Sequence, residues 1–411
     1  MQTIAIIGGG ASGLMAACSA LRANRQARVI IIERNSRMGK KLLATGNGRC
    51  NMTNMHADIG KYHTDYAAEA ESVLSQFKPE RAMEFFGELG LAYHITTDGL
   101  VYPRSMQAAS VLDALRFEAD KLGAQVICDF DAVKMTKDGG VYVVHDKSGK
   151  TITADKVIVA AGSHASTNGA EQQLLKPFGH TYSKSHPALV PLATDVSAIK
   201  TAAGMRAMAQ ATLMIDGKSV RSEYGEVQFC DYGLSGIVIM QLSGIVSEHF
   251  AYSKKGAVEI ALDLMNEYSA ESCRDMLFSR RAALGHVDTE NFLCGVLNKR
   301  VAMAVIKAAG CDFSRTAAEI SDAQIIRITE ILKDWRIAVT GTRGYAQAQV
   351  CGGGLRISEF DGHTLESKLV CGMYAVGEAL DIYGDCGGYN LHWAWASGWV
   401  AGTAAGMDAG Q

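Results

Sequence analysis

The stretch TIAIIGGGASGLMAACSALRANRQARVIIIE, residues 3–33, decides the fold class. Residues 3–7 and 28–32 are short apolar runs, which are typical of strands buried on both faces of a sheet. Between them stand three glycines spaced G-x-G-x-x-G and a segment with apolar residues at helical spacing. The second run ends at an acid, Glu33. This order of strand, glycines, helix, strand and acid predicts a nucleotide-binding β-α-β unit.

The three glycines have separate roles in such a unit. Gly8 permits a tight turn, Gly10 lets the backbone approach a pyrophosphate, and Gly13 lets the helix pack closely on the strand. The helix begins near Ala11 and Ser12, where free N–H groups and the positive end of the helix dipole would face the phosphates.

The acid at position 33 indicates which dinucleotide cofactor the unit binds. Glu33 follows Gly13 by twenty residues, where a carboxylate accepts hydrogen bonds from the ribose hydroxyls of an adenosine. Its charge would repel a 2′-phosphate, so FAD or NAD is favoured over NADP. The glycine motif alone is also consistent with an ordinary glycine-rich turn of an α/β protein. All five features in the required order favour a dinucleotide site.

Later segments favour FAD over NAD. Residues 124–156 alternate with turn signals and predict a β-meander, and residues 156–162 (KVIVAAG) predict a buried strand that ends in glycine. Residues 373–381 (MYAVGEALD) repeat this pattern with Glu378 after the glycine, where a carboxylate suits a sugar hydroxyl of the cofactor. Residues 387–402 open a helix with paired glycines, whose N–H groups would face the N1–C2=O edge of a flavin and stabilise its reduced form.

Residues 39–54, GKKLLATGNGRCNMTN, are too polar for a core strand and too rich in glycine for a helix. Here glycines let backbone approach a cofactor, cations offset phosphate or reduced-flavin charge, and asparagines hydrogen-bond in both directions. The alternative is a solvated loop closed by asparagine turns. Cys50 has no cysteine nearby in the sequence, so we expect a small packed side chain rather than a redox thiol. The glycines of this segment are Gly39, Gly46 and Gly48, the cations are Lys40, Lys41 and Arg49, and the asparagines are Asn47 and Asn51.

The composition restricts the partners and the compartment. The chain has 411 residues, 48% of them hydrophobic, which is enough for two or three domains. A formal charge of −3 supplies no basic field, so we expect a small-molecule substrate and no nucleic acid. Ten cysteines without CxxC spacing indicate reduced thiols in the cytoplasm, and the histidines lack the spacing of a metal site. The apolar N-terminal segment lacks a basic leader and is interrupted by glycines, so we expect neither a signal peptide nor a membrane span.

Taken together, these segments resemble a flavoprotein family that includes aminoacetone oxidase-like and bile-acid enone reductase-like (BaiN-like) enzymes. The resemblance covers nearly the whole chain and depends on GGGASGLMAA, ERNSRMGKKLLATGNGRCNMTN, MYAVGEALD and GGYNLHWAWASGWVAG. It implies an α/β fold in which a Rossmann-like FAD-binding domain is interrupted by a β-rich domain with a helical insertion. It also implies that residues 39–54 run beneath the pyrophosphate towards the isoalloxazine ring.

Three segments depart from the pattern of that family. After VIVAAG the family has a loop close to GGxSxPxTGSTGDG, where this chain has SHASTNGAEQQ, residues 163–173. Residues 229–237 (FCDYGLSGI) carry Asp231 and Ile237 where histidine and proline are common. Residues 102–110 (YPRSMQAAS) differ from an FPxSxKAS-like sequence. We therefore expect a different flavin-side loop and substrate, and no catalytic histidine at position 231.

The middle of the chain is expected to form the inserted part. PALVPL, residues 187–192, marks an exit from the first domain. Residues 205–230 and 258–264 have the alternation of β-strands. Three helices are predicted from SCRDMLFSRRAAL, ENFLCGVLNKRVAMAVIKAAG and AQIIRITEILKDW, the last with a capping box from Ser321 to Gln324.

These boundaries predict three parts. Residues 1–190 and 351–411 form the FAD-binding domain, residues 191–265 and 335–350 the β-rich domain, and residues 266–334 the helical insertion. No second G-x-G-x-x-G unit occurs, so a nicotinamide would use the substrate cleft. Large aromatic residues dominate core burial, so we expect packing rather than ligand stacking for the tryptophans, and structural roles for two histidines. These residues are Trp393, Trp395, Trp399, His186 and His392.

The expected function is that of an FAD-dependent oxidoreductase with noncovalent flavin. The resemblance implies hydride transfer at N5, which either reduces the activated C=C bond of an enone-type substrate or oxidises a small amine with release of hydrogen peroxide. Reduction of the enone is the first choice, with NAD(P)H considered as the electron donor. A rival of another class is a flavin-carrying RNA-modifying or RNA-binding protein. The oligomeric state stays open.

The candidate catalytic residues are Arg49 and Tyr232. No metal ligands are expected. The candidate cofactor-binding residues are Gly8, Gly10, Ala11, Ser12, Gly13, Glu33, Arg34, Lys40, Lys41, Gly46, Gly48, Arg49, Cys50, Asn51, Ala132, Ala161, Gly162, Gly377, Glu378, Gly387, Gly388, Tyr389, Asn390 and Leu391.

Overall fold

A computed structural model describes residues 1–163, 170–252 and 255–407 of the chain. The chain divides into two compact units. The first unit comprises Met1–Ser185 and Val350–Gln411, and the second comprises His186–Gln349. Each unit has its own hydrophobic core.

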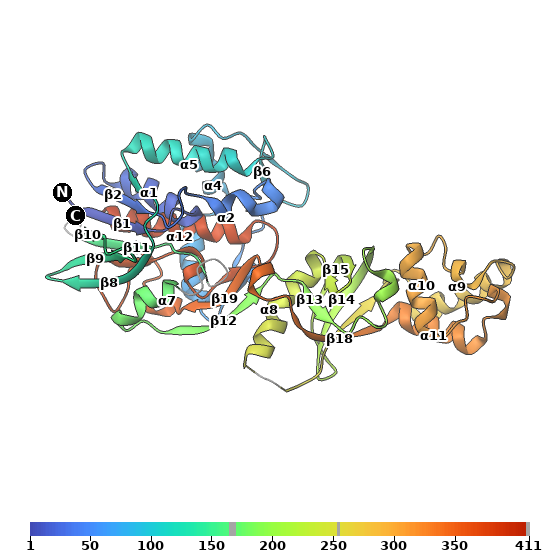
Figure 1. Cartoon of the computed structure of the whole chain (residues 1–411). Helices are drawn as coiled ribbons and strands as arrows, with labels where there is room; N and C mark the ends of the chain where they lie inside the picture. The colour runs from blue at the N-terminus through green and yellow to red at the C-terminus, as the bar shows by residue number, and fades with distance from the viewer. Residues whose placement is uncertain (164–169, 253–254, 408–411) are drawn as a thin grey trace. The chain divides into compact units, whose positions relative to one another are not determined.

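A five-stranded parallel sheet forms the centre of the first unit, in the order β20-β11-β1-β2-β7. Its inner strands are apolar and buried, because a sheet with elements on both faces excludes water from both. The Rossmann-type fold expected from the sequence is thereby confirmed, and Figure 1 shows β1 beside β2 and β11. The strands are β1 (Thr3–Ile7), β2 (Arg28–Ile32), β7 (Gln125–Ile127), β11 (Lys156–Val159) and β20 (Met373–Ala375).

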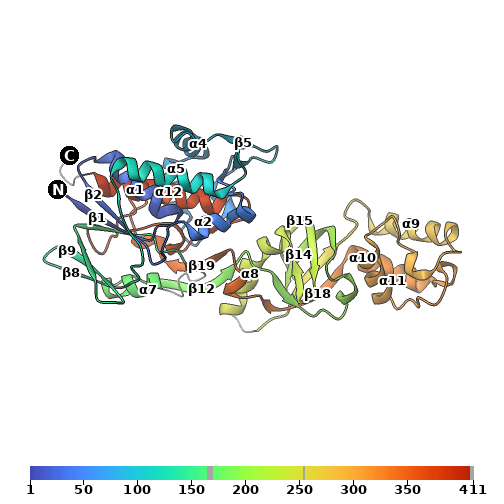
Figure 2. The same cartoon turned by 45° about the horizontal axis from the view of Figure 1, so that its top comes forward.

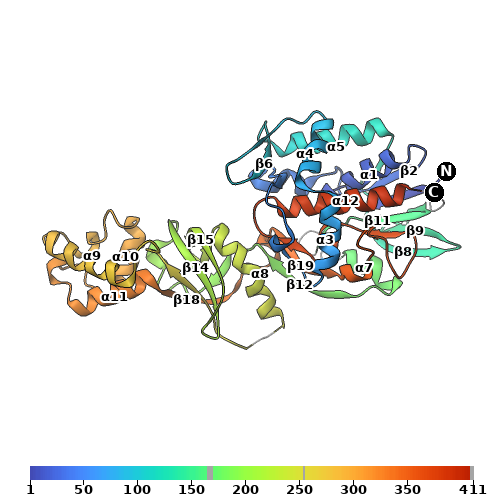
Figure 3. The same cartoon turned by 180° about the vertical axis from the view of Figure 1, so that it is seen from behind.

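Helices α1 (Ala11–Ala23) and α12 (Tyr389–Gly406) lie side by side (Figure 3). Their contact runs along small residues. A methyl group on Gly402 would lie 2.4 Å from the carbonyl oxygen of Ala16. The same group on Gly398 or Gly406 would lie 2.4 or 2.5 Å from a backbone oxygen of α1. These three glycines, spaced four residues apart in α12, therefore let the two backbones approach closely.

The tryptophans of α12 lie in the core, as expected from the sequence. Trp393 and Trp395 are 2% and 0% exposed, and each indole N–H donates to a backbone carbonyl. Trp399 is partly buried and packs on Phe77.

Smaller elements complete the first unit. Strands β8–β10 form the expected antiparallel meander, but its predicted range began too early, because β7 pairs with β2 in the parallel sheet. Helices α3, α4 and α5 were not predicted. The smaller elements of the first unit are α2 (Lys40–Ala44), β3 (Thr53–Asn54), β4 (Tyr62–His63), α3 (Ala67–Gln76), α4 (Pro79–Glu88), β5 (Tyr93–Ile95), β6 (Leu100–Pro103), α5 (Ala108–Leu122), β8 (Ala132–Asp138), β9 (Val141–Asp146), β10 (Thr151–Ala154), α7 (Ala170–Leu175), β12 (Tyr182–Ala188), β19 (Val350–Leu355) and β21 (Tyr383–Gly384).

The second unit contains a closed barrel in the order β13-β16-β15-β14-β17-β18, which Figure 2 shows with three further helices α9, α10 and α11. Closure leaves the barrel without a free edge strand. The elements are β13 (Leu192–Thr194), β14 (Arg206–Ile215), β15 (Lys218–Cys230), β16 (Gly233–Ser235), α8 (Ile237–Tyr252), β17 (Val258–Asp263), α9 (Ala270–Ala283), α10 (Lys299–Ala308), α11 (Asp322–Lys333) and β18 (Trp335–Thr342).

The three predicted helices are present, but the second prediction is wrong over its first half. Residues 290–298 are not helical beyond a short turn, and α10 begins only at Lys299. Gly295 has a left-handed backbone (φ +82°), and the Asn298 side chain caps the helix after it. The capping box from Ser321 to Gln324 is confirmed.

Candidate cofactor site

The glycine-rich loop joins β1 to α1 at the carboxyl edge of the parallel sheet. A methyl group on Gly13 would lie 1.9 Å from the carbonyl oxygen of Gly8, so close packing requires glycine there. A methyl group on Gly10 would meet no described atom within 4 Å. Gly10 caps α1 without a side chain, and the first turn holds no acid. The loop thus has an open approach at Gly10 and a helix start suited to an anion.

Glu33 lies directly after β2 and is 7% exposed. Its carboxylate accepts hydrogen bonds from the backbone N–H of Gly9 at 3.0 Å and of Asn35 at 2.8 Å. The backbone oxygen of Glu33 accepts from Phe130, which brings the segment before Ala132 alongside β2. The glycine loop, Glu33 and the start of the meander are therefore joined by hydrogen bonds. We call these three segments together the rim.

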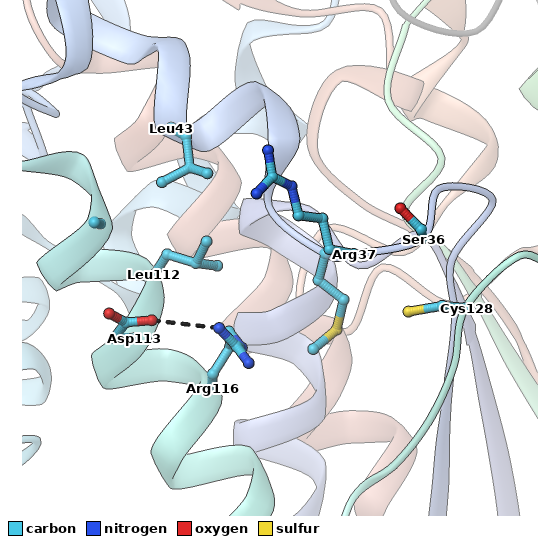
Figure 4. Close-up of a pocket in the computed structure, with 9 residues that line it drawn as sticks. Ser36, Arg37, Leu43, Leu112, Asp113, Arg116 and Cys128 are labelled. Carbon is cyan, nitrogen blue, oxygen red and sulfur yellow. Dashed lines mark hydrogen bonds and ion pairs between the residues drawn. The ribbon is translucent and has the colours of Figure 1, made fainter.

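A cavity of about 290 Å³ adjoins this rim, between residues 36–43 and α5 (Figure 4). Cys128, which follows β7, lines it, and Arg116 of α5 turns towards Asp113 at 3.4 Å. The remaining lining residues are Ser36, Arg37, Met38, Leu43, Ala109 and Leu112. The lining thus combines apolar side chains with two guanidinium groups.

Residues 39–54 contain a short helix and a left-handed loop. Gly39 is buried with φ +77°, and a methyl group there would lie 2.4 Å from Leu112. Gly46, Asn47 and Gly48 all have left-handed backbone and are exposed. The Arg49 guanidinium is exposed, donates to the Gly46 carbonyl and lies 5.8 Å above the Tyr102 ring.

Cys50 is fully buried, and burial raises the pKa of its thiol to about 12. The prediction of a small packed side chain is therefore confirmed. All ten cysteines are free thiols.

The end of this segment is fastened to the start of α12. The Trp395 indole donates to the Met52 carbonyl at 2.8 Å, and Thr53 Oγ1 lies 2.9 Å from His392 Nδ1. The Asn54 amide donates to the Gly387 carbonyl at 3.1 Å. Segments more than 300 residues apart in the sequence thus meet at the paired glycines.

The side-chain oxygen of Asn51 at this junction lacks a hydrogen-bond partner among the described residues. Asn51 is 9% exposed, and its Oδ1 atom is buried without a partner. A methyl group on Gly388 would lie 2.8 Å from this atom. A buried amide oxygen beside the helix start is suited to accept from a donor of a bound molecule, since leaving it unsatisfied is unfavourable. The junction therefore fits the polar ring edge of a flavin.

Glu378 forms an ion pair that the sequence did not reveal. Its Oε2 atom lies 2.5 Å from Lys41 Nζ and accepts from Ser163 Oγ at 2.9 Å. Gly377, before it, is held by Ser397 and Trp393 of α12. The sequence assigned Lys41 to phosphate charge and Glu378 to a sugar, whereas the structure joins the two residues directly. No local signal could have paired residues that lie 337 positions apart.

The remaining predicted positions are divided among several elements. The Asn390 side chain holds its own loop by accepting from Gly384 N–H and donating to Gly384 O, both at 2.8 Å. The Tyr389 carbonyl accepts from the Tyr62 hydroxyl at 3.0 Å. Ala161, Gly162 and Leu391 are partly buried, and Arg34 and Lys40 are exposed. Of the variant loop SHASTNGAEQQ, residues 164–169 lie outside the described part of the chain.

Tyr232 belongs to the second unit, whereas Arg49 belongs to the first. Tyr232 lies in the turn between β15 and β16, and the Arg343 guanidinium lies 4.6 Å above its ring. Burial, with Cys230 as a further cause, raises the pKa of Tyr232 to about 12, while Ser235 and Arg343 act in the opposite direction. The tyrosine therefore keeps its proton at neutral pH. The contact with Arg343 was not predicted from the sequence.

Both histidines expected to be structural are buried. Burial lowers the pKa of His392 to about 4, so this histidine is neutral at pH 7. In the described ranges, no group of three or more His, Cys, Asp and Glu side chains is arranged to hold a metal ion. No helix in the part that the structure describes is both long and apolar enough to cross a membrane.

Comparison with known proteins agrees with the resemblance seen in the sequence. Residues 2–404 match the family described as HI0933-like protein Rossmann domain. The 3-dehydro-bile acid delta(4,6)-reductase of Clostridium scindens is 36% identical over 411 residues, covering 98% of this chain and 99% of the relative. The ribosomal RNA dihydrouridine synthase of Escherichia coli is 28% identical over 401 residues, covering 96% of each.

Among solved structures, the 3-ketosteroid-delta4-(5alpha)-dehydrogenase of Rhodococcus jostii RHA1 is 13% identical with a TM-score of 0.47, covering 98% of this chain and 96% of the other. The family match over nearly the whole chain and the identity to the reductase of Clostridium scindens decide the classification. The chain belongs to the HI0933-like Rossmann-domain family, and it is an FAD-dependent oxidoreductase.

Proposed function

We propose that the protein reduces a C=C bond conjugated with a carbonyl group in a steroid-like enone. The observation that carries this proposal is the 36% identity, over 98% of the chain, to a relative named as a delta(4,6)-reductase of 3-dehydro-bile acids. Conjugation with the carbonyl makes the distant carbon of the C=C bond electron-poor. Bound FAD, once reduced by the electron donor, would supply the hydride to that carbon, and a proton would be added at the neighbouring carbon.

The proposed flavin site uses the rim and the junction described above. The start of α1 would hold the pyrophosphate, Glu33 the ribose hydroxyls, and the start of α12 with Asn51 the polar edge of the flavin ring. We propose noncovalent binding through the whole set of cofactor-binding residues predicted from the sequence. Acid precipitation of the holoenzyme should then release FAD, and flavin that stays with the protein would contradict this part of the proposal.

Two residues are proposed to act in the reaction. Arg49, exposed beside the left-handed loop, would offset negative charge on the reduced cofactor. Tyr232, protonated at neutral pH, would supply the proton at the carbon next to the carbonyl. Tyr232→Phe should then slow reoxidation of the reduced enzyme by the enone by roughly 10²–10⁴-fold, while reduction by the donor is unchanged.

NAD(P)H is the proposed electron donor. With no second dinucleotide motif in the sequence, donor and enone would use one cleft in turn, which predicts ping-pong kinetics. The test is anaerobic: NADH or NADPH should bleach the flavin, and a conjugated 3-oxosteroid should restore its colour faster than dissolved oxygen does. Bleaching by a small primary amine alone, with peroxide released in air, would replace this function with that of an amine oxidase.

A second candidate substrate is uridine in RNA. It is favoured by the 28% identity, over 96% of the chain, to a ribosomal RNA dihydrouridine synthase. The C5=C6 bond of uracil is also conjugated with a carbonyl group, so the two named relatives share one reaction class. The net charge of −3 is a sum over the whole chain and describes no local surface. Mass spectrometry of nucleosides from rRNA treated with enzyme and NADPH would detect a gain of two hydrogens per uridine.

The proposed division of labour follows the predicted domain boundaries. Residues 1–190 and 351–411 would bind FAD, while residues 191–265 with 335–350 and the helices of 266–334 would contribute to substrate recognition. The barrel strands and α9–α11 support this division, because they lie within these ranges. Ten free thiols favour the cytoplasm as the compartment.

A further inference from the structure

The small sheet β3-β6-β5 presents aromatic and cationic groups on one face. Along β6 the side chains alternate, with Val101 and Pro103 buried and Leu100 and Tyr102 more exposed. His94 of β5 is paired directly with Tyr102, so both side chains lie on the same face. Their rings are nearly parallel, with an interplanar angle of 23° and centroids 6.0 Å apart.

Arg49 adds a cationic group beside Tyr102. Its guanidinium carbon lies 5.8 Å from the centre of the Tyr102 ring, within the range of a cation–π contact. Tyr102 therefore has two planar neighbours, a guanidinium and an imidazole. One small ring would use only part of this array, whereas successive bases of a strand could use all of it.

The surroundings are exposed and poor in negative charge. All three residues of β5 are exposed, including Tyr93 at 38% and Ile95 at 44%. Residues 45–56 and 92–107, which form the sheet and its connections, contain two arginines and two histidines but one carboxylate, Asp98. The local charge is thus complementary to a phosphate backbone, although the whole chain is slightly acidic.

The same face leads to the junction at the start of α12. Asn54 of β3 is paired with Leu100 of β6, and the Asn54 amide donates to the Gly387 carbonyl. The Leu100 side chain would lie 3.6 Å from a methyl group placed on Gly387. A molecule lying on Tyr102 would therefore reach, over Leu100, the glycines that begin the proposed flavin site.

We propose that Arg49, Tyr102 and His94 form a stacking surface for bases of single-stranded RNA. The proposal rests on the second candidate substrate and names the element that would recognise it. Aromatic side chains bind unpaired bases by stacking, and every base offers a ring face. The cationic surroundings would attract the phosphates, so binding should weaken as the salt concentration rises.

The test measures binding of a fluorescently labelled oligouridylate of about ten nucleotides to the flavin-loaded protein. Tyr102→Ala should weaken binding by about 5–150-fold, the effect of losing one stacked base, whereas Tyr102→Phe should stay within about threefold of the wild type. His94→Ala should also weaken binding. Tyr224→Ala is the matched control, because Tyr224 is a 57% exposed tyrosine on β15 of the second unit. It should bind as the wild type does.

Several outcomes would overturn the proposal. They are absence of RNA binding to the wild type, wild-type affinity in Tyr102→Ala, and an equal loss in Tyr224→Ala. A raised KM for the steroid enone in Tyr102→Ala with unchanged RNA affinity would assign the surface to a small ring instead. RNA binding that depends on Tyr102, without formation of dihydrouridine, would support the surface and reject only RNA as the reduced substrate. Flavin content and unfolding midpoints of each variant separate these results from misfolding.

Discussion

Replacing Gly402 with alanine tests whether the contact between α1 and α12 holds the cofactor loop in place. The new methyl group would lie 2.4 Å from the carbonyl oxygen and 2.8 Å from the Cα atom of Ala16. An ordinary contact needs about 1 Å more, so the helices must separate. Because both obstacles are backbone atoms, no side-chain rotation can relieve the clash.

The expected cost follows from two opposing effects. Overpacking in a tight core costs about 1–3 kcal/mol. Alanine in a helix interior recovers about 1 kcal/mol relative to glycine. Because the obstacles are backbone atoms, the upper part of that range applies, about 2–3 kcal/mol, and we therefore expect a net loss of about 1–2 kcal/mol for Gly402→Ala. Since α1 begins at the glycine loop, its displacement should also weaken FAD binding.

Urea unfolding followed by tryptophan fluorescence measures the effect in the correct unit. Three of the four tryptophans lie in α12, and the fourth, Trp335, lies in the second unit. The midpoint should fall by about 0.5–1 M. Gly87→Ala is the control, because a methyl group on this glycine of α4 would meet no described atom within 4 Å. It should leave stability unchanged or raise it by up to about 1 kcal/mol. Equal midpoints for Gly402→Ala and the wild type would refute the reasoning.

Three further predictions concern single side chains. Glu33→Gln should lower FAD affinity by about 10–150-fold in a flavin fluorescence titration, because a charge-assisted hydrogen bond is worth about 1.5–3 kcal/mol, and unchanged affinity would exclude the ribose role. Burial lowers the pKa of His392 to about 4, so the unfolded chain takes up the proton first, and stability should fall as pH drops from about 6.5 to 4. His392→Gln should show a shallower loss over that range in urea unfolding, and an identical slope would contradict this. Ser321→Ala should destabilise the second unit by about 1 kcal/mol in thermal unfolding, since it removes the cap of α11, and a stability unchanged within error would count against that role.

The sequence predicted those parts of the fold and site that depend on neighbouring residues. The glycine loop, the strand before it and Glu33 lie within residues 3–33, so their order alone determines one local unit. The capping box of α11 is local in the same way. Helices α3 and α4 were missed although Pro79 at the start of α4 is a helix-start signal.

Features that join distant segments could not be predicted. The ion pair joins Lys41 and Glu378, which are 337 positions apart in the sequence. The residues around each of them give no indication of the other. The second predicted helix failed for a local reason, since the left-handed Gly295 interrupts an apolar pattern that otherwise continues. The contact of Arg343 with Tyr232 likewise depends on barrel strands that meet only after folding.

The packing of α1 against α12 also affects how the protein folds while the ribosome synthesises it. During synthesis the glycine-bearing helix emerges last among the described helices, long after its partner, at a pace of about 5–20 residues per second. Until then α1 exposes the small-residue face that α12 later covers, and the sheet still lacks β20. The barrel unit, encoded in between, can reach its native state first. Newly made chains therefore spend roughly tens of seconds with an unfinished nucleotide-binding unit.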